Sequence, residues 1–332
     1  MNVDHLLFDQ RMPHINRDRR QGDQILTTGS VPPSAEKEEE NMIKKIAVIN
    51  DLSGFGRCSL AAAISVTAAM GVQPCPFPTA VLSAQTGYPS YYIDDFTDKM
   101  DFIRQEWKKM NVSFDGIYTG FLADEKQIEK VTDFLDTFYG KKTFLLVDPI
   151  MGDEGKQFSI FSAEFVRLMK ELVYRADIIT PNLTELCLLT DTDYRMIGQM
   201  TEEKHLFTII EQMAKNVIAK GPHEIVITGI RFRDSASGEE KIGNLYVTKK
   251  ESSLAAFPFI GESFSGTGDL FASAIAGGKA RGDRIPDIIE KAGKMIELAM
   301  KDSVRDGVPR NEGVEYEPYL GILMGKPSLV YR

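Results

Sequence analysis

The 332-residue chain has few of the residues on which several common kinds of site depend. Its three cysteines, Cys58, Cys75 and Cys187, are odd in number and include no CxxC pair. They argue against a disulfide framework and a cysteine-built zinc site, and they fit a reducing, cytoplasmic compartment. Of the four histidines, only His205 and His223 lie in the regularly patterned region, so a Ser-His-Asp or Cys-His mechanism has few candidates.

Other signals are also missing. No run of about 18 apolar residues occurs, so no membrane span is expected. Acidic residues outnumber basic ones by 48 to 39, which gives no sign of a basic surface for nucleic acid. Neither GxGxxG nor GxxxxGK[ST] is present, which argues against a dinucleotide oxidoreductase and a P-loop enzyme. The balance of 43% hydrophobic and 26% charged residues is typical of a soluble globular protein.

Residues 1–41 differ from the rest of the chain. They are polar, contain Pro32-Pro33 and end in a charge run, so they are predicted to be disordered, and they lack the apolar core of a secretory signal. Two interpretations remain open: a flexible native tail, or a translated leader upstream of a natural start at Met42. Peptides from 1–41 in the native protein would contradict the second. Residues 42–332 are expected to form one domain.

From residue 44 onward, predicted strands alternate with predicted helices. This alternation predicts a mostly parallel sheet with helices on both faces. In such sheets, ligands bind beyond the carboxyl ends of the strands. The predicted strands are 44–50, 114–120, 143–149, 176–182 and 224–229, with an edge or extended segment at 73–82 and a strand pair at 241–250 and 254–258. The predicted helices are 59–72, 94–110, 124–138, 162–176, 182–190, 202–220, 270–282 and 286–304.

Polar residues follow the first two extended segments. Asp51 could bind a polar group of a substrate or stabilise a turn. The segment 83–88 offers hydroxyls, an amide and an aromatic ring, which suits an aromatic substrate with hydrogen-bonding groups but also suits an ordinary loop. Its candidate residues are Ser83, Gln85, Thr86, Gly87 and Tyr88.

Three later strands also end in polar residues. Asp148 precedes a proline and could serve a metal or phosphate site or start a turn, and the polar loop 152–156 could be a lid. Asn182 and Glu185 resemble a helix-capping box but could also reach a hydrated Mg²⁺. Thr228-Gly229 could contact a nucleotide phosphate or form a turn.

The segment Gly266-Thr267-Gly268-Asp269 precedes a run of small and apolar residues. Small residues leave backbone N–H groups uncovered at a helix N-terminus, where they form an anion site. Phosphoryl transfer needs such donors, and Asp269 could accept a proton from an attacking alcohol. The alternative is that Asp269 is a helix-start residue favoured by the dipole.

Taken together, these residues resemble the ribokinase superfamily and, within it, the pyridoxal kinase family, which phosphorylates vitamin B6 vitamers. The resemblance extends from about Lys45 to the C-terminus. It rests on GTGD at 266–269, PNLTE at 181–185, VDPIMGD at 147–153, SAQTGY at 83–88 and VIT at 226–228. It implies a ribokinase-like three-layer sandwich, ATP and Mg²⁺ as co-substrate and cofactor, a possible monovalent cation and a homodimer.

The resemblance also implies roles for individual residues. Asp269 would be the catalytic base, with Gly266, Thr267 and Gly268 around the transferring phosphoryl group. Nucleotide binding would fall to Asp148, Asn182, Glu185, Thr228, Gly229 and Thr267, with Asp148 and Glu185 organising the metal.

The chain departs from the family pattern at three substrate-binding positions. Asp51 stands where a serine contacts the ring, Gln85 where histidine is common, and Phe121 where a tyrosine often packs near the substrate. The charge of Asp51 leads to the hypothesis that the amine vitamer is preferred. Alternatives are a hydroxymethylpyrimidine or sugar kinase of the same superfamily, and a vitamin-binding protein without turnover.

Overall fold

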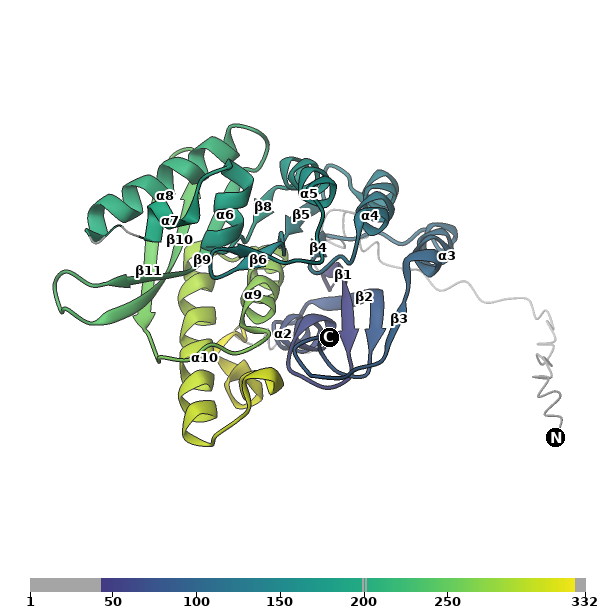
Figure 1. The fold of residues 1–332 in the computed structure, drawn as a ribbon. Coiled ribbons are helices and arrows are strands. Elements are labelled where there is room, and N and C mark those ends of the chain that lie inside the picture. The colour runs from purple at the N-terminus through teal and green to yellow at the C-terminus, as the bar shows by residue number, and fades with distance from the viewer. Residues whose placement is uncertain (1–42, 199, 201, 326–332) are drawn as a thin grey trace, which may run out of the picture. The chain divides into compact units, whose positions relative to one another are not determined.

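The computed structural model describes residues 43–198, 200 and 202–325. The segment 1–41, predicted to be disordered, lies outside these residues. In the described part, nine strands form one sheet in the order β11-β10-β9-β8-β5-β4-β1-β2-β3 (Figure 1). These strands are β1 (Lys45–Ser53), β2 (Gln73–Leu82), β3 (Ile93–Asp95), β4 (Gly116–Thr119), β5 (Phe144–Val147), β8 (Ile178–Ile179), β9 (Glu224–Arg233), β10 (Glu240–Thr248) and β11 (Ser252–Pro258).

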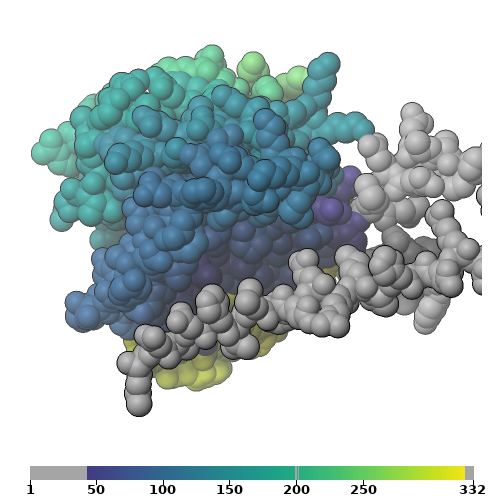
Figure 2. Space-filling model, turned by 90° about the vertical axis from the view of Figure 1, so that its right-hand side faces the viewer, coloured from purple at the N-terminus to yellow at the C-terminus, as the bar shows by residue number. Residues whose placement is uncertain are grey.

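Helices cover both faces of this sheet, which confirms the predicted three-layer arrangement (Figure 1). One face carries α3 (Thr97–Lys109), α4 (Glu125–Phe138), α5 (Ala163–Arg175), α6 (Leu183–Thr190) and α8 (Glu203–Ile218). The other carries α2 (Ser59–Ala69), α9 (Thr267–Arg281) and α10 (Ile285–Arg305). Figure 2 views the side of the domain on which β3, α3 and α4 lie.

The alternation of side chains along β1 explains the two layers. Ala47 and Ile49 point into the core beneath α3 to α8, whereas Ile46 and Val48 point into the core beneath α2, α9 and α10. Because both faces are covered, the strand is apolar throughout rather than alternately polar. The strands β1, β2, β4, β5, β8 and β9 are parallel, as the helix–strand alternation predicts.

Several predicted boundaries are wrong. Residues 94 and 95, predicted to be helical, belong to β3, which pairs antiparallel with Ala80–Leu82 of β2. The prolines of β2 come before the residues that pair with β3. Because proline has no N–H to donate to a neighbouring strand, only the second half of β2 has a strand on both sides. The loop 152–156 is a hairpin of β6 (Gly152–Asp153) and β7 (Lys156–Gln157). The short helices α7 (Tyr194–Gly198), η1 (Arg310–Glu312) and η2 (Glu317–Ile322) were not predicted.

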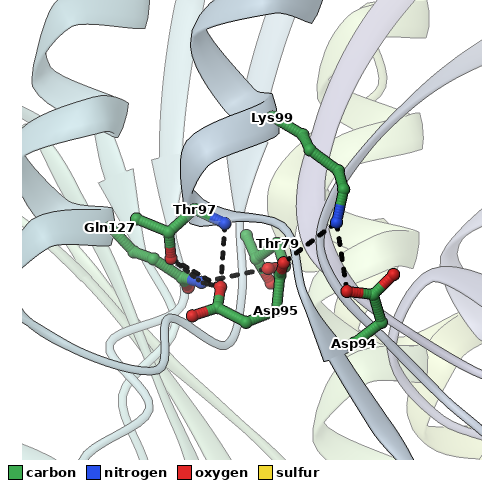
Figure 3. Close-up of polar contacts among 6 residues, drawn as sticks. All are labelled: Thr79, Asp94, Asp95, Thr97, Lys99 and Gln127. Atoms are coloured by element: carbon green, nitrogen blue, oxygen red, sulfur yellow. Dashed lines mark hydrogen bonds and ion pairs between the residues drawn. The ribbon is translucent and has the colours of Figure 1, made fainter.

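A buried polar network joins β2, β3, α3 and α4 (Figure 3). The Gln127 side chain is fully buried, and its Nε2 donates to the Thr79 carbonyl and the Thr97 hydroxyl, both at 3.0 Å. Asp95 accepts hydrogen bonds from the N–H and hydroxyl of Thr97, at the start of α3. The Thr79 hydroxyl donates to the Phe121 carbonyl at 3.3 Å, which links this network to the loop after β4.

Candidate active site

The strands β1 and β4 are parallel neighbours, but the chain adds its later strands on opposite sides of them. From β1 the chain moves outward to β2 and β3, and then returns to the other side of β1 to form β4 and the strands beyond it. Parallel sheets open a crevice for ligands at such a switch point. The polar ends of β1 and β4 and the N-terminus of α9 meet there.

Asp269 is held at this crevice by two donors from other elements. Asn50, fully buried at the end of β1, donates from Nδ2 to Oδ1 of Asp269 at 3.1 Å. The backbone N–H of Ser59, the first residue of α2, donates to the same carboxylate. Ser59 has a φ of 51°, a left-handed conformation that is uncommon for a non-glycine residue and is found most often at functional sites. The carboxylate is therefore fixed by β1 and α2, although it lies on α9.

The surroundings of Asp269 tune its ionisation. Burial raises its pKa from 3.8 to about 6, and the nearby Asp51 carboxylate adds to this rise. The hydrogen bonds from Ser59 and Asn50 oppose it, because they stabilise the ionised form. The side chain nevertheless remains partly exposed. Asp269 is thus a partly exposed carboxylate whose pKa lies well above that of an ordinary aspartate.

Asn50 itself is fixed by the loop that follows β4. Its Oδ1 accepts hydrogen bonds from the N–H groups of Asp51 and Phe121, at 3.0 and 2.9 Å. A Cβ on Gly120 would lie 2.4 Å from Asn50 Nδ2, so only glycine leaves room for this side chain. Phe121, a predicted substrate residue, is thereby positioned next to Asn50, which donates to Asp269.

Asp51, also predicted to bind the substrate, is only 6% exposed. Its Oδ2 accepts the Ser53 hydroxyl at 2.9 Å, and the Ser59 hydroxyl is a second donor. Burial raises the pKa of Asp51, and the two hydroxyl bonds partly offset this rise. The carboxylate that the amine hypothesis requires is therefore already bonded to two side chains of the chain itself.

Two more carboxylates are buried nearby: Asp148 directly after β5, and Glu185 in the first turn of α6, the helix that follows β8. Burial and the nearby Asp269 raise the pKa of Asp148 to about 7, although the Thr180 hydroxyl donates to it at 2.9 Å. Burial and Asp148 also raise the pKa of Glu185 well above its usual range. Asn182 and Glu185 form the complete capping box of α6, so the capping interpretation of this pair holds. Asn182 also donates from Nδ2 to the carbonyl of Gly152, which anchors the β6–β7 hairpin.

The pair Asp148 and Glu185 suits a hard cation. Each oxygen of a carboxylate has more than one acceptor site, so these groups can still accept from metal-bound waters. A cation would also offset the effects that raise the two pKa values, which are burial together with the charge of Asp269 near Asp148 and the charge of Asp148 near Glu185. Among the described residues, no three His, Cys, Asp or Glu side chains form a ready-made metal cluster, so such a cation would keep much of its water shell.

An apolar cavity of about 160 Å³ opens beside the N-terminus of α9. It brings together four of the residues that were predicted at the nucleotide and phosphoryl sites: Thr228, Gly229, Thr267 and Gly268. Apolar side chains from β11 and α10, among them Phe257, Ile296 and Met300, line much of it, and Glu297 of α10 also faces it. The arrangement fits a flat, largely apolar group with phosphates directed at α9.

Residues 85–88 of the predicted segment 83–88 line a second depression, together with residues near the C-terminus. Gln85, Thr86, Gly87 and Tyr88 face this depression, and Ser265, Pro309, Arg310 and Asn311 complete it. Ser83 lies apart: it is exposed, and its hydroxyl accepts the N–H of Tyr92 at 2.8 Å. Residues 309–311 were not predicted from the sequence, because the contacts of Asn311 with Gln85 and Gly87 span more than 220 positions.

No helix in the described part of the chain has the length and apolar character needed to cross a membrane.

Comparison with known proteins identifies relatives of the chain. Residues 53–313 match the family model described as phosphomethylpyrimidine kinase. The pyridoxal kinase of Rubrobacter xylanophilus is 24% identical over 270 residues, covering 79% of this chain and 88% of that protein. The hydroxymethylpyrimidine/phosphomethylpyrimidine kinase of Bacillus subtilis is 28% identical over 197 residues, covering 58% and 66% of the two chains. A protein from Bacteroides thetaiotaomicron, assigned as a phosphomethylpyrimidine kinase and crystallised with pyridoxal, is 35% identical with a TM-score of 0.77, covering 85% and 96%.

Proposed function

The chain belongs to the phosphomethylpyrimidine kinase family of the ribokinase superfamily, and we propose that it transfers the terminal phosphoryl group of ATP to the hydroxymethyl group of a B6 vitamer. The observation that carries this proposal is Asp269, a partly exposed carboxylate at the N-terminus of α9, held by Asn50 and the Ser59 N–H. The vitamer is favoured over a pyrimidine by the relative that was crystallised with pyridoxal.

In this mechanism, Asp269 accepts the proton of the attacking hydroxyl. With a pKa of about 6 it is mostly ionised at neutral pH, yet it is basic enough to bind the proton as the oxygen attacks phosphorus. Asn50 donates to Oδ1 and the Ser59 N–H also donates to the carboxylate, and the remaining acceptor sites of the two oxygens can serve the alcohol.

The N-terminus of α9 meets the charge on the transferring group. The N–H groups of Thr267, Gly268 and Asp269 belong to the first turn, where a helix has no acceptor of its own for them. Gly266 has a φ of 83°, and a Cβ there would lie 2.1 Å from the Arg57 carbonyl, so glycine is required for this turn. A Cβ on Gly268 would meet no atom within 4 Å, which leaves open space above the donors.

Asp148 and Glu185 would hold Mg²⁺ through waters, and the ion would supply neutralisation of the phosphate charge. Thr228 and Gly229 would contact the nucleotide, whose base would enter the apolar cavity between β11 and α10.

The proposal is tested by ADP release over a panel of alcohols: pyridoxal, pyridoxine, pyridoxamine, hydroxymethylpyrimidine and ribose. We expect the highest kcat/KM on a vitamer and a loss of about 10³-fold or more in kcat for Asp269→Asn, with ATP affinity nearly unchanged. Preference for hydroxymethylpyrimidine would instead favour the second activity found among the relatives. Turnover of no alcohol by the wild-type chain would favour a binding protein.

A further inference from the structure

One short segment near the C-terminus, Pro309–Gly313, is bonded to three loops of the candidate site. The N–H of Arg57 donates to the Glu312 carbonyl at 2.9 Å, and that of Ser265 donates to the Arg310 carbonyl at 3.1 Å. Gln85 donates from Nε2 to the Asn311 carbonyl at 3.1 Å. The segment therefore connects the loop after β1, the loop after β2 and the turn before α9.

The Asn311 side chain fixes the loop after β2 most directly. Its Nδ2 donates to the Gly87 carbonyl at 2.7 Å, while the Gly87 N–H donates to Gln85 Oε1 at the same distance. A Cβ at position 87 would lie 2.7 Å from Asn311 Oδ1 and 2.8 Å from Gln85 Nε2. A side chain at position 87 would therefore displace the amides of Gln85 and Asn311, and the Gln85 amide is hydrogen-bonded within the chain through both its oxygen and its nitrogen.

Arg310 differs from the other arginine of this region. Arg57 pairs with Glu317 at 2.8 Å and approaches Glu315 at 3.8 Å, so its charge is neutralised. Arg310 lines the depression beside Thr86 and is exposed. It has no ion pair with any residue in the described part of the chain. The depression therefore contains a cation that is available to a ligand.

We propose that Pro309–Gly313 is a substrate-recognition segment, in which Asn311 positions the loop 85–88 and Arg310 binds an acidic oxygen on the substrate ring. This inference rests on the proposed function. A B6 ring carries an acidic hydroxyl, and a guanidinium forms strong, charge-assisted hydrogen bonds with such an oxyanion. An aminopyrimidine ring carries no such group, so Arg310 would discriminate between the two classes of alcohol found among the relatives.

The test of Arg310 compares pyridoxine with 3-deoxypyridoxine, which keeps the reacting alcohol but lacks the ring hydroxyl. For the full chain, we expect kcat/KM to be about tenfold higher for pyridoxine, since a hydrogen bond to a charged group is involved. Arg310→Met should lower kcat/KM for pyridoxine about tenfold and leave the deoxy compound within about twofold, and Arg310→Lys should recover part of the loss. Equal losses on both compounds, or no loss, would overturn the role of Arg310.

The test of Asn311 separates positioning from general stability. Asn311→Ala should raise the KM for both ring compounds about fivefold and leave the KM for ATP unchanged, because it removes the one neutral hydrogen bond that the Asn311 side chain donates to the loop. Asn216→Ala, on the exposed side of α8, is the matched control. An equal rise in both KM values, or none, would overturn the positioning role. A wild-type chain inactive on every vitamer would contradict the proposed function itself, whereas active enzyme with unchanged variants would contradict only this inference.

Discussion

Replacement of Asn50 by alanine should move the pH dependence of the reaction. Asn50 donates to Asp269 at 3.1 Å, and this bond lowers the pKa of the carboxylate, which burial raises to about 6. Without the donor the ionised form loses a partner and the pKa rises further. The reaction should therefore need a higher pH to reach its full rate.

The size of the shift follows from the strength of the bond. A hydrogen bond to a charged group contributes about 1.5 to 3 kcal/mol, and a difference of about 1.4 kcal/mol between protonation states is one pKa unit. A rise of about one unit would reduce the ionised fraction at about pH 6 from roughly one half to roughly one tenth. The variant should be about fivefold less active there, and the deficit should shrink as the pH increases.

The assay is kcat/KM for the alcohol substrate between about pH 5 and 9, since this ratio reports the pKa values of the free enzyme. The acid limb should move upward by about one unit. Urea unfolding supplies a second reading, because the N–H groups of Asp51 and Phe121 lose their buried acceptor at a cost of about 1 to 3 kcal/mol each. An acid limb that stays in place or moves downward would refute the assignment of Asn50 and Asp269.

Three further substitutions test the same site. Gly120→Ala should reproduce the loss of activity of the Asn50 variant and cost about 1 to 3 kcal/mol, because the new methyl group displaces Asn50. Gly140→Ala, where a Cβ meets no atom within 4 Å, is its control in urea unfolding, and equal effects of the two would contradict the steric argument. Gly268→Ala should lower kcat more than about tenfold while thermal stability stays equal or rises, since alanine favours the helix but fills the space above its N-terminus; unchanged kcat would place the phosphoryl group elsewhere. Asp148→Asn should raise the urea midpoint at about pH 8 but not at about pH 3, where the aspartate is protonated in both states. The folded pKa of about 7 exceeds the ordinary 3.8, so wild-type stability falls as the pH rises between them, and an unchanged midpoint at high pH would contradict this account.

The sequence was sufficient for the sheet and for the position of the catalytic candidate. Apolar strands such as 143–149, flanked by helices with apolar periodicity, allow little besides a parallel sheet with two covered faces. The turn Gly266–Asp269 was identifiable because its small residues have a physical purpose at a helix N-terminus. The short strand β3 and the hairpin β6–β7 were not, since two or three residues carry no periodicity and depend on neighbouring strands for their hydrogen bonds.

The partners of the site residues could not be predicted in the same way. Asn50 and Asp269 are 219 positions apart, and Asn311 and Gly87 are 224 apart. No spacing rule links such pairs, because their proximity depends on the packing of α9 and of the C-terminal segment against β1 and β2. Asp51 illustrates the same limit. As a strand-end carboxylate it suggested a substrate contact, but the fold surrounds it with Ser53 and Ser59.

For Glu185, the interpretation as a helix cap and the interpretation as part of a ligand site do not exclude each other. Glu185 caps α6 by accepting the N–H of Asn182, accepts a second hydrogen bond from the N–H of Met151, and lies close enough to Asp148 for that carboxylate to raise its pKa. Burial is the main cause of the raised pKa values of Asp148 and Glu185, and carboxylates buried in this way make the ligand-free fold less stable than neutral side chains would. A purely structural cap would not require Asp148 beside it. A cation and phosphates bound at this edge, as proposed above, would offset this cost by pairing the charges, so the burial of Asp148 and Glu185 side by side is itself an argument for a charged ligand.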